Sequence, residues 1–107
     1  MAHAETYTKL GKTNLKVGDH DGANNQLKTA LRARQHVNPK DLKVAELQEI
    51  LGDMSVELKK YDDSLEYYDG ALTTLRQQTG YNRVKADDTI FMILVKKGNV
   101  SLECGKK

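Results

Sequence analysis

The 107-residue chain lacks tryptophan and holds only one phenylalanine, one proline and one cysteine. Because the lone Cys104 has no intramolecular disulfide partner, we expect a reducing intracellular location, cytoplasmic or nuclear. Scarce proline and few aromatic residues favour helices over strands. The first residues show neither the basic nor the apolar region of a signal peptide. The longest apolar run, Ile90–Val95, is too short to cross a membrane, so we expect no membrane partner.

An excess of charge of one sign is also missing. Seventeen Lys and Arg residues face 15 Asp and Glu residues, which gives a formal net charge of +2. This balance produces no strong field for DNA or for anionic lipid, so we do not expect a nucleic-acid partner. A nucleic-acid-associated scaffold stays as a less favoured alternative, supported only by the slight basic excess. Hydrophobic residues make up 38% of the chain and charged residues 30%, which is too apolar for a disordered protein.

Side chains that could perform chemistry are few and scattered. His3, His20 and His36 lie in three separate segments, and neither they nor Cys104 occur at the spacing of a zinc site. Asp19–Gly22 begins like a calcium loop, but the fifth and sixth positions lack the required ligand and glycine, so we interpret the two aspartates as helix caps. The sequence has no phosphate-binding loop and no nucleophile with a matching base. We expect no enzymatic activity, no cofactor, no metal and no small-molecule substrate.

The residues that are abundant indicate an all-α fold of about five helices. Apolar residues recur at intervals of three and four, which is the spacing of one helix face. We expect the first, second and fifth helices at about 4–17, 22–35 and 85–104. Asn38 as N-cap, with Pro39 at the first helical position, predicts the start of the third helix, and Asp62 is the expected cap of the fourth.

Two parts of the chain resemble each other at an offset of 41 residues. Gly11 and Gly52 differ by this offset, and so do Ala30 and Ala71. In each copy the glycine precedes the alanine by 19 residues (11 to 30, and 52 to 71). Because a helix pair cannot bury its apolar face alone, such copies stack on one another, and small residues permit close helix crossings. We therefore expect Gly11 and Gly52 to lie where the two helices of each hairpin cross.

This pattern resembles that of the tetratricopeptide repeat (TPR) family, which reads aromatic-x2-Leu-Gly-x2-Tyr and then Ala-x3-Phe-x2-Ala. The matching residues of the first copy are Tyr7, Leu10, Gly11, Ala23, Leu27 and Ala30. Those of the second copy are Leu51, Gly52, Ser64, Tyr68 and Ala71. A third copy begins with Leu94-x2-Lys97-Gly98. The period exceeds the usual length of about 34 residues. In this respect the chain is similar to the long-period branch that includes kinesin light chain and the LGN-type and Tonsoku-type scaffolds.

The resemblance implies one domain over residues 1–107, in which antiparallel helix hairpins form a right-handed superhelix. We expect the first repeat at about 4–37, the second at about 39–79, and one helix of an incomplete third repeat at about 85–104. Residues 105–107 stand where the turn into another helix would begin. We interpret the chain as a fragment of a longer array; a small protein capped by its fifth helix is the alternative.

The resemblance also implies a function, because the first helix of each TPR hairpin lines a concave groove that binds a peptide or helical segment of a partner protein. The expected groove residues are Thr8, Lys12, Lys16, Glu46, Glu49, Asp53, Glu57 and Asn99. The four acidic ones share a helix face and repel each other, so a ligand with basic residues would be favoured. The alternative is a solvated acidic face that is paired with Lys12 and Lys16. A basic clamp for a terminal carboxylate is not expected, because its positions hold only two basic residues, Lys12 and Lys96.

The fifth expected helix contains six consecutive apolar residues, Ile90–Val95, which would cover every side of a helix. We expect part of them to form a hydrophobic association surface. This surface comprises Phe91, Met92, Leu94 and Val95. It could pair two copies into a homodimer or dock a hydrophobic helix of a partner. The competing function is accordingly a structural or self-assembly segment that stacks on further repeats or dimerises through the fifth helix. The alternative is a fifth helix buried entirely in the core.

Overall fold

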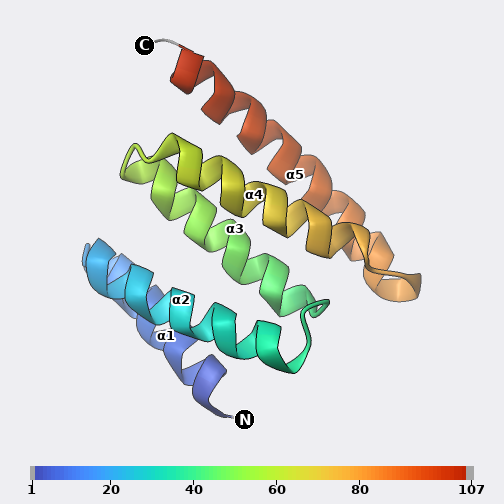
Figure 1. Ribbon diagram of the computed structural model, residues 1–107, viewed down its shortest axis with the longest axis horizontal. Helices are drawn as coiled ribbons and strands as arrows, with labels where there is room; N and C mark the ends of the chain where they lie inside the picture. The colour runs from blue at the N-terminus through green and yellow to red at the C-terminus, as the bar shows by residue number, and fades with distance from the viewer. Residues whose placement is uncertain (1, 106–107) are drawn as a thin grey trace.

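The computed structural model describes residues 2–105, with side chains from Ala4 to Cys104. Within these residues the fold is all-α, with five helices and no strand (Figure 1). The helices are α1 (Ala2–Lys16), α2 (His20–Val37), α3 (Leu42–Glu57), α4 (Tyr61–Arg76) and α5 (Gly80–Gly105). No helix in the described part of the chain has the length and apolar character needed to span a membrane. Lys106 and Lys107, part of the expected next turn, lie outside the described residues.

The turn between α2 and α3 corrects one expectation. Asn38 does not cap α3; it ends α2, with an extended backbone (φ −156°, ψ 97°) and its N–H bonded to the Arg34 carbonyl. The physical reason is Pro39, whose ring disfavours a helical conformation in the residue before it. The N-cap of α3 is Asp41, whose carboxylate accepts a hydrogen bond of 2.9 Å from the Lys43 N–H. Pro39 therefore lies in the turn and not in the helix.

The starts of α4 and α5 also differ from expectation. Asp62 is not a cap, because α4 begins at Tyr61 with Lys60 at the N-cap. Asp62 instead lies in the first turn, where its charge favours the helix N-terminus. α5 begins at Gly80, five residues before the expected position 85, since Gly80 adopts the left-handed φ of +59° that glycine tolerates.

The helices form two antiparallel hairpins, α1–α2 and α3–α4, and α5 lies along α4 (Figure 1). Gly11 and Gly52 lie at the crossings of these hairpins, which confirms the expectation. A Cβ atom on Gly11 would lie 2.5 Å from Leu27 Cγ, and one on Gly52 would lie 2.5 Å from Tyr68 Cε1. Both distances are shorter than any ordinary carbon contact, so the large side chain of the second helix fits only because the first helix carries glycine.

The core consists of two apolar clusters that meet at α3. The first cluster joins α2 to α3, and its buried residues are Ala23, Leu27, Ala30, Leu31, Val44, Leu47, Leu51 and Met54. The second joins α3, α4 and α5, and its buried residues are Ala45, Tyr68, Ala71, Leu72, Leu75, Ala86, Ile93 and Val100. Full burial of one such large side chain contributes roughly 1.5–3 kcal/mol. Because α3 contributes to both clusters, it joins the two hairpins into one stack.

Candidate functional site

Side chains from α1, α3 and α5 line two neighbouring pockets, and we call this side of the molecule the groove face. One pocket, of about 260 Å3, lies chiefly between α1 and α3, and another, of about 330 Å3, lies between α3 and α5. The expected groove residues in the first pocket are Thr8, Lys12 and Glu46. Those in the second are Asp53, Glu57 and Asn99. Since Glu46, Asp53 and Glu57 share one side of α3, both pockets open on the same face.

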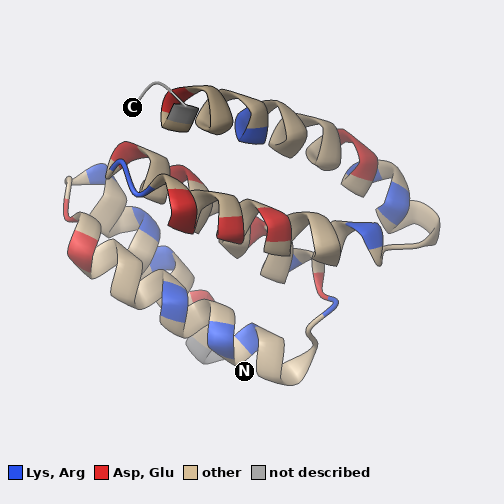
Figure 2. Cartoon of the chain, turned by 45° about the horizontal axis from the view of Figure 1, so that its top comes forward, with Lys and Arg blue, Asp and Glu red and all other residues tan. Residues whose placement is uncertain are grey.

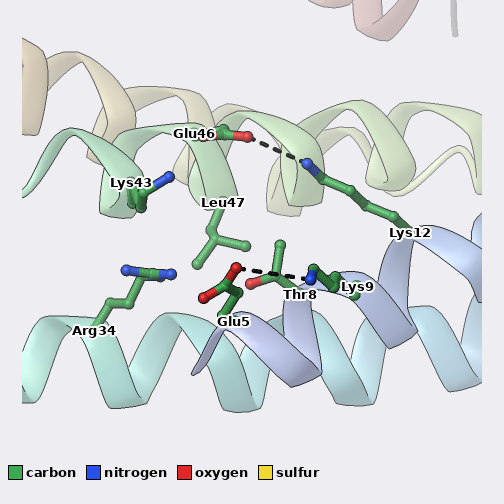
Figure 3. A pocket seen from close by; sticks show the side chains of 8 residues that line it. All are labelled: Glu5, Thr8, Lys9, Lys12, Arg34, Lys43, Glu46 and Leu47. Atoms are coloured by element: carbon green, nitrogen blue, oxygen red, sulfur yellow. Dashed lines mark hydrogen bonds and ion pairs between the residues drawn. The ribbon is translucent and has the colours of Figure 1, made fainter. Parts of the chain in front are cut away.

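The first pocket has more cationic than acidic side chains (Figure 3). Its charged residues are Lys9, Lys12, Arg34, Lys43, Glu5 and Glu46. Lys12 Nζ lies 3.3 Å from Glu46 Oε1, and Lys9 Nζ lies 3.7 Å from Glu5 Oε1. Leu47 points between these side chains but is buried in the first core cluster (Figure 3). Arg34 and Lys43 are left without an ion pair among the described side chains, so this pocket presents an excess of positive charge.

The second pocket has the opposite balance. Its carboxylates belong to Asp53, Glu57 and Glu103, and Lys96 is its cation. The half-buried Val56 adds apolar surface between these charges. Glu57 is largely exposed, and its carboxylate lies 4.0 Å from His20 Nε2 at the edge of the first hairpin. The second pocket therefore presents an excess of negative charge.

Lys96 of α5 ties the second pocket to α3. Its Nζ atom lies 2.7 Å from Glu49 Oε2 and 3.1 Å from Asp53 Oδ2. Partial burial lowers the pKa of Lys96, but the hydrogen bonds to the two carboxylates outweigh that effect, so the pKa is raised overall. The lysine therefore stays charged and fixes α5 against α3.

Tyr68 of α4 reaches the floor of the same pocket. Its hydroxyl donates a hydrogen bond of 2.5 Å to Asp53 Oδ1. Burial of the phenol, followed by this bond to a carboxylate, raises the pKa of Tyr68 well above its ordinary value. One side chain thus fills the space left by Gly52 with its ring and positions Asp53 with its hydroxyl.

The acidic side chains of α3 are paired more fully than the sequence suggested. Lys12 pairs with Glu46 as the solvated-face alternative proposed, but Lys16 makes no ion pair among the described residues and lines neither pocket. The partner of Glu49 and Asp53 is instead Lys96. The sequence pattern gave the position of Lys96 in the repeat but not its ion pairs, because helical spacing does not give the tilt of α5 against α3.

Three cations of the first pocket were also missed: Lys9, Arg34 and Lys43. Arg34 belongs to α2, a second helix of a hairpin, which the repeat pattern does not place on the groove face. Lys43 is in the first turn of α3, three residues before Glu46 and so on the same side of the helix. It was missed because the groove residues expected on this helix began at Glu46.

The expected association surface on α5 divides into two sides. Phe91, Leu94 and Val95 are exposed by 67, 45 and 48% and lie on the outer side, away from α4. Met92, 54% exposed, precedes Asn99 by seven residues and so lies on the side of the groove face. Ile93 between them is completely buried against α4, so the helix is neither fully covered nor fully exposed.

Charge is unevenly distributed over the whole chain as well. The charged residues of α1 and α2 are mainly Lys and Arg, whereas those of α3 and α4 are mainly Asp and Glu (Figure 2). The described residues contain no group of three or more His, Cys, Asp or Glu side chains placed to hold a metal ion. The geometry offers two oppositely charged pockets on one face.

The chain matches no known family model and no curated protein.

Proposed function

We propose that the chain is a TPR-like helix-hairpin scaffold, intracellular and without enzymatic activity, that binds a peptide or helical segment of a partner protein on the groove face. The observation that carries the proposal is the opposite charge of the two pockets. The glycine contacts support the TPR-like part, because the same small-to-large contact occurs in both hairpins. The resemblance to TPR sequences supports the use of this face for protein binding.

The charges of the pockets define the chemistry of the ligand. An acidic residue fits the first pocket beside Arg34 and Lys43, and a basic residue fits the second beside Glu57. The earlier expectation of a basic ligand therefore becomes that of a segment with an acidic and a basic end.

Apolar contacts support the binding of a long basic side chain. A lysine or arginine of the ligand can lay its aliphatic stem on the half-buried Val56 while its charged end meets Glu57. This contact matters because an exposed ion pair alone contributes only about 0–1 kcal/mol. We expect the ligand to combine charge complementarity with this apolar contact.

A display library of random 16-residue peptides tests the proposal. We expect the selected peptides to carry acidic residues toward one end and basic residues toward the other, and to bind more weakly as salt is raised. Selected peptides without any charge pattern, bound equally well at high salt, would contradict a charged groove.

A charge-reversal pair gives the matched control. Arg34→Glu with Lys43→Glu removes the unpaired cations of the first pocket and should weaken the selected peptides at least tenfold. Lys28→Glu with Lys40→Glu changes the net charge equally, but neither residue lines either pocket of the groove face, so binding should persist. Equal weakening by both pairs would mean that net charge, and not the groove, attracts the peptide.

A further inference from the structure

The third copy of the repeat packs in the same register as the second. In α3, Leu47 lies five residues before Gly52, and Met54 two residues after it, and both pack in the cluster with α2. In α5, Ile93 and Val100 hold the same positions relative to Gly98, and both pack in the cluster with α4. α5 therefore lies on the second hairpin as α3 lies on the first.

The same register identifies the side of α5 that corresponds to the α4-facing side of α3. On α3, α4 covers that side at three positions. Ala45 is buried in the cluster with α4, Gln48 Oε1 accepts a hydrogen bond of 3.0 Å from Thr74 Oγ1, and Gly52 receives the Tyr68 ring. A helix thus fits against this side through a glycine notch flanked by small and polar residues.

On α5, the equivalent side is open. Phe91 and Leu94 hold the positions of Ala45 and Gln48, and they are exposed by 67 and 45%. Leu102, which corresponds to the half-buried Val56, is 68% exposed. A Cβ atom added to Gly98 would meet nothing within 4 Å, whereas at Gly52 it would touch the Tyr68 ring. We call this side, formed by Phe91, Leu94, Val95, Gly98 and Leu102, the outer face of α5.

We propose that the outer face of α5 docks an amphipathic helix of a partner protein, antiparallel to α5, with a large side chain that enters the notch at Gly98. The two hairpins define the sequence of that helix. Their second helices read Ala23-x3-Leu27-x2-Ala30 and Ser64-x3-Tyr68-x2-Ala71, with Leu27 and Tyr68 over the glycines. The partner helix therefore carries a small residue, a Leu or aromatic residue four positions later, and Ala after a further three.

A second copy of this chain does not meet that requirement. Its own Leu27 and Tyr68 are 0 and 1% exposed, because they already fill the space beside Gly11 and Gly52. It could offer either side chain only by opening a hairpin of the core. The apolar side chains around Gly98 lie away from the two pockets of the groove face, so this site is separate from the groove.

The probe is a fluorescent synthetic peptide with the sequence of residues 60–78, which contains Tyr68 in the required pattern. Binding to the full chain is followed by anisotropy. We expect saturable binding that falls at least tenfold for Gly98→Leu, which fills the notch, and for a peptide with Tyr68→Ala. Lys85→Leu, on another side of α5, should bind as the unchanged chain does. Leu94→Glu is a second variant on the outer face, and circular dichroism checks that each variant folds.

Three results would overturn the proposal. One is an absence of binding up to millimolar chain. Another is that Gly98→Leu and Leu94→Glu bind the peptide as strongly as the unchanged chain does, which would mean that the peptide exchanges with α4 or binds elsewhere. The third comes from sedimentation of the chain alone: a concentration-dependent dimer that Leu94→Glu dissociates would assign the outer face to a second copy.

Discussion

Gly11, Gly52 and Gly98 hold the same position in α1, α3 and α5, yet they have different surroundings. The first two lie beneath Leu27 and Tyr68, while Gly98 has no neighbour within 4 Å of its missing Cβ. The same substitution should therefore have opposite effects on stability at the two kinds of position. At a helix crossing, steric contact decides how the substitution changes stability, and at an open helical site backbone entropy decides it.

We expect Gly52→Ala to lower the free energy of unfolding by about 1–3 kcal/mol, because its methyl group collides with the buried Tyr68 ring. Gly98→Ala should raise that free energy by up to about 1 kcal/mol, because alanine favours a helix more than glycine does. Urea unfolding followed by circular dichroism measures both. A higher midpoint for Gly52→Ala would contradict the close crossing.

A second prediction about single residues concerns the hydrogen bond of Tyr68. Tyr68→Phe keeps the ring over Gly52 but removes the hydrogen bond to Asp53, which should cost about 0.5–1.5 kcal/mol of unfolding free energy. Tyr81→Phe, at a side chain that is 78% exposed, is the control and should change stability little. Unfolding of both variants by urea at neutral pH checks the difference; equal losses would mean that the bond contributes nothing.

The raised pKa of Tyr68 also makes stability depend on pH. The folded chain holds the phenol proton more tightly than the unfolded chain, whose ordinary value is 10.0. The stabilisation is therefore fully present below about pH 10 and is lost as the pH rises above it. Lys96, whose folded pKa is also raised, acts in the same direction. Urea midpoints measured across this range should fall less steeply for Tyr68→Phe than for Tyr81→Phe; identical slopes would contradict the assignment to Tyr68.

At the scale of elements, α5 shows how one apolar run serves two purposes. Ile93 is buried against α4 while Phe91, two residues earlier, is 67% exposed. We expect Ile93→Ala to lower the free energy of unfolding by about 2–5 kcal/mol, because it leaves a cavity in the second cluster. Phe91→Ala should change it by no more than about 0.5 kcal/mol. Thermal melts of the two variants compare these effects, and a larger loss for Phe91→Ala would mean that the wrong side faces α4.

The elements also show how far sequence reasoning reaches. Periodicity predicted five helices, and the repeated glycines predicted where the hairpins cross, because both signals lie in short-range spacing. The start of α3 at Leu42 with Asp41 as its cap, and the starts of α4 at Tyr61 and α5 at Gly80, were missed. A carboxylate just before a turn can cap in more than one register, and Gly80 uses a left-handed φ. The ion pairs of Lys96 depend on how α5 leans on α3, and one sequence contains no signal for that angle.

For the whole molecule, the main feature is the separation of charge. A formal net charge of +2 hides a basic first hairpin and an acidic second hairpin (Figure 2). The groove face crosses the boundary between them, so its two pockets differ in sign although they share α3. The net charge alone indicates only that nucleic acid and lipid are not favoured as partners. The arrangement of the charges predicts a ligand with an acidic and a basic end.

Nuclear magnetic resonance of the 15N-labelled chain during titration with a selected display peptide tests the groove most directly. We predict the largest amide shifts around the two pockets, at Thr8 and Lys12 of α1, at Glu46 and Asp53 of α3, and at Asn99 of α5. Amides on the far sides of α2 and α4, such as those of Lys28 and Thr73, should stay unchanged. Saturable shifts confined to α2 and α4, with none on α1 or α3, would contradict the proposal that this scaffold binds its partner on the groove face.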